Sequence, residues 1–287
     1  MDYVRNLIHC GGPASRGITG KGVGVAVLDT GIFPHIDFED RIVGFYDAVS
    51  HRRAPYDDNG HGTHIAAIIG GNGRQSGGKY AGVAPGSHII AVKVLDSSGN
   101  GYASDVLAGL SWIRRQKERL GIRIVNISVG SYAGKYMSED SALVRGVVVA
   151  AGNHGPANMS VTTPGISRKV ITVGCSDDHK KVLVRGSVMV DYSGRGPTAA
   201  CICKPEIIAP GAKVVSCTNR DGQYSMKSGT SMATPVAAGA IALLLEKYPD
   251  LSNRDVKLRL KERAIDLKLP KNQQGWGFLD VERLLQE

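Results

Sequence analysis

The segment SGTSMATP, residues 228–235, stands directly before the apolar run VAAGAIALLL, residues 236–245. A run of this length predicts a buried helix, with Ser231 where the helix begins and Pro235 in its first turn. The unpaired N–H groups at a helix start stabilise negative charge that forms nearby, which suits a nucleophilic serine. Serine is also a common N-cap, so this segment alone leaves both interpretations open.

Two further segments carry the partners that such a serine needs. Residues 23–28 (VGVAVL) are typical of a buried parallel strand, and they end at Asp29, at the edge where open α/β sheets keep their sites. His61 stands shortly before the apolar run 65–69 (IAAII), so we expect it to begin a second helix. A carboxylate that orients an imidazole, which in turn takes the proton of a serine, is an arrangement for attack on a carbonyl carbon.

Three blocks resemble the signature motifs of the subtilisin-like (S8) serine proteases: DTG at 29–31, HGTH at 61–64 and GTSMATP at 229–235. Their order along the chain is that of subtilisin. The character of the chain is nearest to the intracellular bacterial members. The resemblance implies an α/β fold in one domain, a three-layer, doubly wound, mainly parallel sheet, with an N-terminal extension at residues 1–22 and the catalytic domain at 23–287.

The same resemblance implies a serine endopeptidase that works through an acyl-enzyme. Ser231 would be the nucleophile, His61 the general base and then acid, and Asp29 the orienting carboxylate. Asn153 follows a buried strand and would donate to the oxyanion. The expected substrate-binding residues lie on two strand edges and in the first specificity pocket: Gly99, Asn100, Gly101, Ser128, Val129, Gly130, Gly152 and Thr162.

The segment expected to wall the specificity pocket, residues 154–166, contains no carboxylate. Recognition of paired basic residues needs buried acids, so we expect a broad preference for apolar or aromatic side chains instead. An alternative from another class is a catalytically silent scaffold that binds a protein partner. The short connection at residues 131–146, with one helix-like piece at 139–145, keeps this alternative open because relatives carry a longer helix there.

No organic cofactor is expected, and the sequence does not support the usual structural calcium. Asp37 lies where many relatives supply a calcium ligand, but the partner loop at residues 70–80 brings no carboxylate and two positive charges. The pair Cys201 and Cys203 has a spacing shorter than that of zinc sites, and no second ligand pair follows. We therefore predict no metal ligands.

The formal net charge of +9 raises nucleic acid or an anionic surface as partners. The basic clusters at 114–119 and 257–263 fall on the polar faces of expected helices, the first running from 104 to 119 with Ser104 as N-cap. We thus expect polypeptide substrates, no nucleic acid and no membrane. An odd number of cysteines and no signal segment favour the cytoplasm, and secretion in a trimmed mature form is the alternative.

Overall fold

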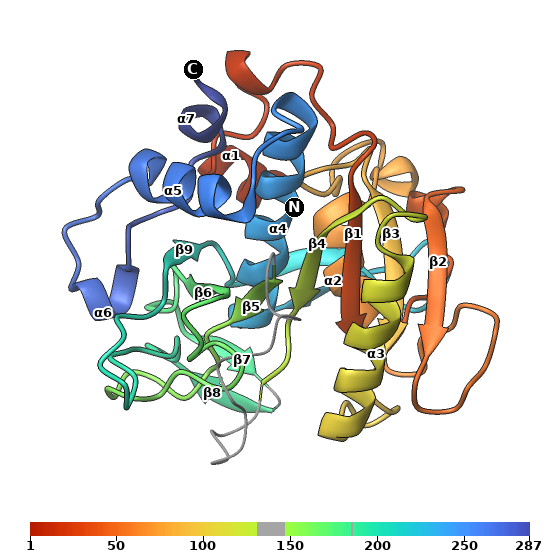
Figure 1. Ribbon diagram of the computed structural model, residues 1–287, viewed down its shortest axis with the longest axis horizontal. Helices are drawn as coiled ribbons and strands as arrows, with labels where there is room; N and C mark the ends of the chain where they lie inside the picture. The colour runs from red at the N-terminus through yellow and green to blue at the C-terminus, as the bar shows by residue number, and fades with distance from the viewer. Residues whose placement is uncertain (131–146, 185) are drawn as a thin grey trace.

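A seven-stranded sheet forms the middle layer of the computed structural model, which describes residues 1–130, 147–184 and 186–287 (Figure 1). Its strand order is β2-β3-β1-β4-β5-β6-β9, and neighbouring strands run parallel. In chain order the strands are β1 (Gly24–Asp29), β2 (Ile42–Asp47), β3 (His88–Lys93), β4 (Ile122–Ile127), β5 (Val147–Ala150), β6 (Ile171–Cys175) and β9 (Ile207–Ala209). The predicted doubly wound, mainly parallel α/β fold is confirmed.

Helices cover both faces of this sheet, which makes three layers (Figure 1). On one face α2 (His61–Gly70) and α4 (Thr230–Lys247) pack against the central strands, and α3 (Ala103–Gln116) lies on the other. The other α-helices among the described residues are α1 (Asp2–Leu7), α5 (Asn253–Arg263), α6 (Lys271–Gln274) and α7 (Val281–Leu285).

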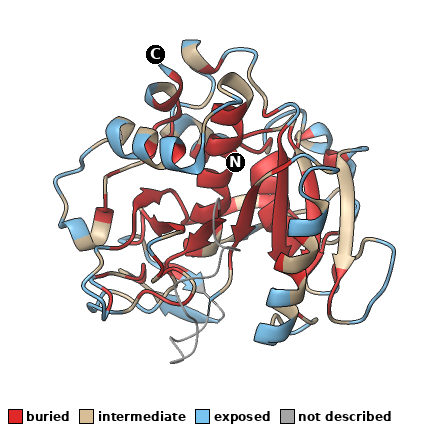
Figure 2. Ribbon diagram, in the orientation of Figure 1, coloured by how far each residue is buried: buried red, intermediate tan, exposed pale blue. Residues whose placement is uncertain are grey.

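The sheet is buried on both faces, which explains why its strands are continuous apolar runs in the sequence. All six residues of β1 are buried, because alternate side chains enter different cores. Val25 and Val27 join the core under α2 and α4, whereas Ala26 and Leu28 join the core under α3. Figure 2 shows this buried centre running through the sheet and α4.

Two antiparallel hairpins complete the strands. One pairs β10 (Val214–Cys217) with β11 (Tyr224–Lys227), and the other pairs β7 (Val182–Val184) with β8 (Ser187–Met189). The chain leaves β11 and enters α4 three residues later, so this hairpin delivers the start of that helix.

The first ten residues pack against the C-terminal part of the chain. Val4 and Ile8 are buried in the core under α4, and the Met1 amino group donates to the Val215 carbonyl at 3.2 Å. His9 Nδ1 lies 2.7 Å from an Asp280 carboxylate oxygen. The sequence left the location of this segment open; the division between residues 22 and 23 remains a prediction.

Two local predictions were wrong. Helix α4 already begins at Thr230, so Pro235 is its sixth residue and lies beyond the first turn. Helix α3 begins at Ala103 after an N-cap at Tyr102, and the Ser104 hydroxyl donates to Asp105 instead of capping a backbone N–H. In both cases helical geometry begins before the residue that the pattern marked. The expected helical piece at 139–145 lies outside the described residues.

Candidate active site

Asp29 and His61 come together at the carboxyl edge of the sheet. Asp29 is the last residue of β1, His61 is the first of α2, and Asp29 Oδ1 lies 2.7 Å from His61 Nδ1. The Asp29 side chain is 1% exposed and that of His61 is 23% exposed. Asp29 Oδ1 also accepts the Thr30 N–H at 2.8 Å. Because the carboxylate holds Nδ1, the nitrogen that remains for chemistry is Nε2.

Ser231 lies at the start of α4, as predicted. Gly229 precedes the helix with a φ of 141°, a backbone conformation that side chains rarely adopt. The Ser231 hydroxyl donates to the Ser128 carbonyl at 2.8 Å. Between Ser231 and His61, both of which the structure describes, it shows no hydrogen bond. The serine is thus at the predicted place, and its hydroxyl is bound to the strand edge.

Asn153 is held beside the start of α4 with its amide oriented. Its Oδ1 accepts the Thr230 N–H at 2.9 Å and the Thr230 hydroxyl at 3.1 Å. The oxygen end is therefore occupied, and the NH₂ end remains as a donor. A Cβ on Gly229 would lie 3.1 Å from Asn153 Nδ2, which places this donor directly against the turn before Ser231.

Asp57 fixes the turn that carries His61, and sequence reasoning missed it. Its carboxylate accepts the Gly60 N–H at 2.8 Å, the Thr63 hydroxyl at 2.6 Å and the Thr30 hydroxyl at 2.8 Å. Burial raises the pKa of Asp57, but the hydrogen bonds from Thr63 and Gly60 outweigh it, so that the pKa falls below its usual value. Asp57 stays an anion and ties the DTG block to the start of α2.

Lys93 is a second residue that sequence reasoning missed. It ends β3 next to Asp29 and is 1% exposed. Its ammonium donates to the Thr30 carbonyl at 2.7 Å, to Asp58 Oδ1 at 2.7 Å and to the Leu95 carbonyl at 2.8 Å. These bonds join the loops after β1, before α2 and after β3. The sequence does contain a signal that could have pointed to Lys93, because this lysine directly follows the apolar residues 89–92 of a predicted strand.

The predicted substrate edges lie on either side of the catalytic residues. Ser128 is buried and carries the carbonyl that binds Ser231, and the chain becomes progressively more exposed through Val129 and Gly130. On the other edge, Asn59 beside His61 donates to the Ser97 carbonyl at 2.9 Å. The turn Gly99–Gly101 follows, and Asn100 N donates to Asp96 Oδ1 at 2.9 Å.

Thr162 lies between two glycines of the predicted pocket. A Cβ on Gly130 would lie 2.4 Å from Thr162 Oγ1, and a Cβ on Gly152 would lie 2.7 Å from the same side chain. The Gly152 N–H donates to the Thr230 hydroxyl at 3.2 Å. The predicted pocket residues therefore meet each other and the start of α4.

Two basic side chains near His61 and Asp29 have lowered pKa values. His64, one turn after His61, is fully buried, and burial lowers its pKa to about 3. Its Nε2 is 3.1 Å from the Ser225 carbonyl, so His64 is a neutral packed residue. Burial also lowers the pKa of Lys227, against the attraction of the Asp29 and Asp57 carboxylates.

Asp37 does not fit a calcium ion. Its Oδ1 accepts the Gln75 N–H at 2.9 Å, and its Oδ2 accepts the Tyr224 hydroxyl at 2.8 Å. The side chains nearest to the carboxylate include His35 and Cys217, which are not the oxygen ligands that calcium takes. That this loop holds no calcium stays a prediction.

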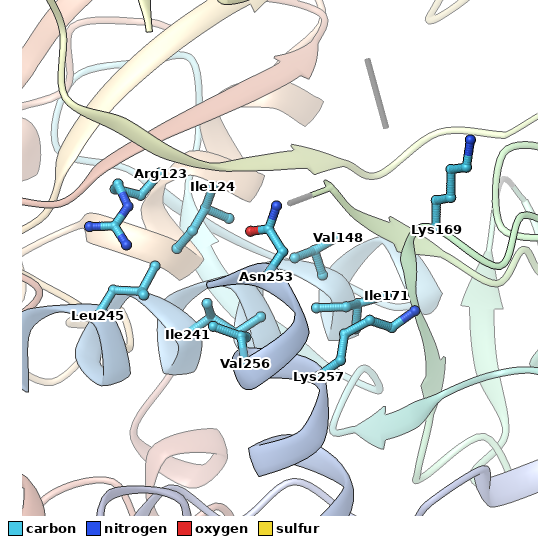
Figure 3. A pocket seen from close by; sticks show the side chains of 10 residues that line it. All are labelled: Arg123, Ile124, Val148, Lys169, Ile171, Ile241, Leu245, Asn253, Val256 and Lys257. Carbon is cyan, nitrogen blue, oxygen red and sulfur yellow. The ribbon is translucent and has the colours of Figure 1, made fainter. Parts of the chain in front are cut away.

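A separate cavity lies at the opposite end of the sheet (Figure 3). Its floor is formed by Ile124, Val148 and Ile171, near the amino ends of β4, β5 and β6, and α5 closes one side. Asp29 lies at the carboxyl end of β1, so this cavity is not part of the candidate site.

The fold and the candidate site together define a class, serine hydrolases that carry Asp, His and Ser, in that chain order, on a parallel α/β sheet. Comparison with known proteins makes this specific. A sequence model of the Subtilase family (Peptidase S8) matches residues 20–277, and the chain belongs to that family.

In the described part of the chain, no helix combines the length and the apolar character needed to cross a membrane.

Curated relatives include serine protease AprX of Bacillus subtilis (strain 168), which is 43% identical over 85% of this chain. The match spans 61% of AprX, so AprX has further sequence that this chain does not cover. Subtilisin Savinase of Lederbergia lenta is 36% identical, and the match covers 93% of this chain and 92% of Savinase. These relatives support a subtilisin-type serine endopeptidase.

Solved structures agree with the fold. A cold-adapted subtilisin-like serine proteinase aligns with a TM-score of 0.74 and 30% identity, over 92% of this chain and 90% of its own. Sphericase aligns with a TM-score of 0.74 and 29% identity, over 94% of this chain and 97% of its own.

Proposed function

We propose that this chain hydrolyses peptide bonds with Ser231 as nucleophile, His61 as general base and Asp29 as the carboxylate that orients it. The observation that carries this assignment is the 2.7 Å contact between Asp29 Oδ1 and His61 Nδ1, at the strand edge where α4 presents Ser231. Asp29 fixes the tautomer with the proton on Nδ1, so Nε2 has the lone pair that can take the serine proton. Family membership favours this enzyme over the silent scaffold.

The reaction begins when the Ser231 hydroxyl changes its hydrogen-bond acceptor. This hydroxyl now donates to the Ser128 carbonyl at 2.8 Å. A substrate that adds a strand along Ser128–Gly130 would bring its own backbone N–H to that carbonyl. The Ser231 hydroxyl then loses its acceptor and can turn to His61 Nε2, so substrate binding would complete the triad.

The following steps use the groups at the two helix starts. Ser231 Oγ bonds to the carbonyl carbon while His61 Nε2 takes the hydroxyl proton, and the carbonyl oxygen becomes an anion. The Asn153 NH₂ group and the Ser231 N–H donate to this oxyanion. The C–N bond then breaks as His61 returns the proton to the leaving amine. A water molecule hydrolyses the acyl-enzyme by the same route.

We further propose a broad preference for apolar or aromatic side chains before the cleaved bond. Thr162, Gly130 and Gly152 bring small and uncharged surfaces together in the pocket. Without a buried carboxylate in residues 154–166, a basic side chain would lose its hydration with no compensating charge. A peptide-library cleavage profile tests this preference, and selection of lysine or arginine at that position would contradict it.

A fluorophosphonate probe tests the enzyme assignment. We expect the wild-type chain to be labelled on Ser231, with labelling lost in Ser231→Ala and strongly reduced in His61→Ala. Ser228→Ala is the matched control, because Ser228 lies three residues earlier and should leave labelling intact. A folded wild-type chain that is neither labelled nor able to cleave unfolded casein would support the silent scaffold instead.

As a protease the chain acts on polypeptides, and we propose that it works in a reducing compartment such as the cytoplasm. All five cysteines have free thiols, among them the buried Cys175 and Cys217, which supports this proposal. Fractionation of the native source with immunodetection tests it, and recovery from the culture medium of intact cells would contradict it.

A further inference from the structure

A second cluster of reactive side chains lies outside the active site. His35, Asp37 and Cys217 are each at most 1% exposed, and one ligand atom from each lies within 4.8 Å of the others. Cys217 Sγ is 3.4 Å from Asp37 Oδ2, and His35 Nδ1 is 3.8 Å from Asp37 Oδ1. The residues come from distant segments: Asp37 lies in the short helix Ile36–Phe38, His35 is its N-cap and Cys217 ends β10.

The oxygens of the Asp37 side chain are held by neutral donors. Asp37 accepts three hydrogen bonds, from Gln75 N, Tyr224 Oη and Cys217 Sγ, as a carboxylate does. In the described part of the chain, no lysine or arginine forms an ion pair with it; its ion-pair contact is with His35. The Arg41 guanidinium lies nearby and donates to the Asp37 backbone carbonyl at 2.6 Å, not to the Asp37 carboxylate.

The imidazole of His35 is also poorly satisfied. Its Nδ1 accepts the Asp37 N–H at 3.2 Å, and its buried Nε2 has no hydrogen-bond partner among the described residues. Nδ1 also lies 3.8 Å from Asp37 Oδ1, so the same nitrogen is near the carboxylate. This tautomer is one that can coordinate a metal ion through Nδ1 if the Asp37 N–H gives way.

We propose that His35, Asp37 and Cys217 form a binding site for one divalent transition-metal ion of the zinc type. Zinc combines imidazole nitrogen, thiolate sulfur and carboxylate oxygen, whereas calcium takes six to eight oxygens. When the ion binds, the thiol proton of Cys217 leaves to solvent. The double positive charge then meets one thiolate and one carboxylate, so the buried site becomes neutral, and a water molecule completes four ligands.

Tyr224 supports the site from outside the ligand shell. Its hydroxyl donates to Asp37 Oδ2 at 2.8 Å, and its ring lies 5.6 Å from that of His35 in an edge-to-face contact. Hydrogen bonds of this kind orient a ligating carboxylate. The ion would connect the segment after β1 with the β10–β11 hairpin that leads to α4.

Cys175 provides a matched control. Its thiol is also buried, donates to Asp177 Oδ1 at 3.2 Å and lies 3.2 Å from the Tyr192 hydroxyl. It therefore has the carboxylate and the phenol but no histidine, since the described residues contain one group of three or more potential ligands, that of Cys217. A metal effect that requires Cys217 and not Cys175 identifies the complete cluster.

The experiment titrates Co²⁺ into the metal-free full-length chain and records its absorption spectrum. All variants carry Ser231→Ala to prevent self-cleavage, and Cys201→Ser with Cys203→Ser to remove the exposed thiol pair. We expect one equivalent of Co²⁺ to give a thiolate-to-cobalt charge-transfer band and the intense visible bands of a tetrahedral ion, displaced by Zn²⁺. The band should persist in Cys175→Ser and vanish in Cys217→Ser. Absence of the band, or its persistence in Cys217→Ser, overturns the proposal.

A second variant covers the case in which Cys217→Ser fails to fold. His35→Gln should weaken Co²⁺ binding by more than the roughly 10- to 100-fold that outer-shell changes cost. Unchanged affinity in folded His35→Gln overturns the proposal. Zn²⁺, and not Ca²⁺, should raise the melting temperature of the metal-free chain; equal effects of both ions also overturn it. These readouts do not depend on peptide hydrolysis.

Discussion

The neutral buried His64 predicts a specific loss of stability in mild acid. Burial, together with the charges of Lys227 and His61, lowers its pKa from 6.5 to about 3. Between these two values the unfolded chain binds the proton and the folded chain does not. The free energy of unfolding must therefore fall as the pH drops below 6.5, and this loss levels off below about pH 3. Above pH 6.5 His64 contributes its full stability.

The size of the effect follows from the shift. One pKa unit corresponds to about 1.4 kcal/mol, so the loss at pH 5 is about 2 kcal/mol, because that pH lies 1.5 units below the unfolded value. The limit at strongly acid pH is about 5 kcal/mol, from the full shift of roughly 3.5 units.

The assay is urea unfolding of the Ser231→Ala chain at pH 8 and pH 5, with and without His64→Gln. Glutamine keeps a donor for the Ser225 carbonyl and does not titrate. The free energy of unfolding should be lower at pH 5 than at pH 8, and we expect His64→Gln to reduce this difference by about 2 kcal/mol. The expectation holds whatever the substitution does to the stability at pH 8. His51→Asn is the control, since His51 is exposed, and it should leave the difference unchanged. If the free energy of unfolding changed equally between pH 8 and pH 5 with and without His64, the reasoning would be refuted.

Three further variants test the site. Asn153→Ala should lower kcat by about 10²–10³-fold with little change in KM, which is the magnitude measured in subtilisin. If the donor assignment is wrong, single-turnover kinetics would show weaker substrate binding and an unchanged chemical step. Lys93→Met should lower the free energy of unfolding by about 1–3 kcal/mol for each partner left unsatisfied, and more than Asp58→Asn does in the same urea titration. Gly152→Ala should impair both folding and cleavage, because its φ is 92° and its Cβ would lie 2.7 Å from Thr162; normal melting temperature and kcat/KM would contradict the close contact.

The sequence predicted the positions of Asp29, His61 and Ser231 because each stands where an apolar run meets a glycine-flanked turn. Such boundaries are local patterns, and the structure places them at the end of β1 and the starts of α2 and α4. The residues that hold these turns were not predictable in the same way. Lys93 acts through partners in other loops, and Asp57 reaches Thr30 in the loop after β1, so their roles depend on contacts that local patterns do not show.

Local sequence patterns also could not predict the edge strand of the sheet or the first residue of α4. Strand β2 is half-buried at the edge of the sheet, and Gly44 interrupts its apolar residues, so it lacks the clear signal of β1. The α4 start was placed late because residues 230–234 (TSMAT) belong to the helix although they precede the continuous apolar run. The Ser231 to Ser128 hydrogen bond depends on a side-chain rotamer, which no spacing encodes.

Register explains how the site is assembled from residues so far apart in the chain. In the parallel sheet β1 lies between β3 and β4, and Asp29 pairs directly with Lys93. Leu28 pairs with Ile127 on the other side, so Ser128 continues β4 at the level of Asp29. One edge thus presents a carboxylate, with a buried cation on one side and the carbonyl that binds the serine hydroxyl on the other. A one-residue slip of β4 would turn its side chains to the opposite core and move the Ser128 carbonyl by roughly 3.3 Å, more than the whole Ser231 hydrogen bond. The dense apolar packing of β1 on both faces, which looks like a stability feature, is therefore what sets the geometry of the proposed catalytic residues.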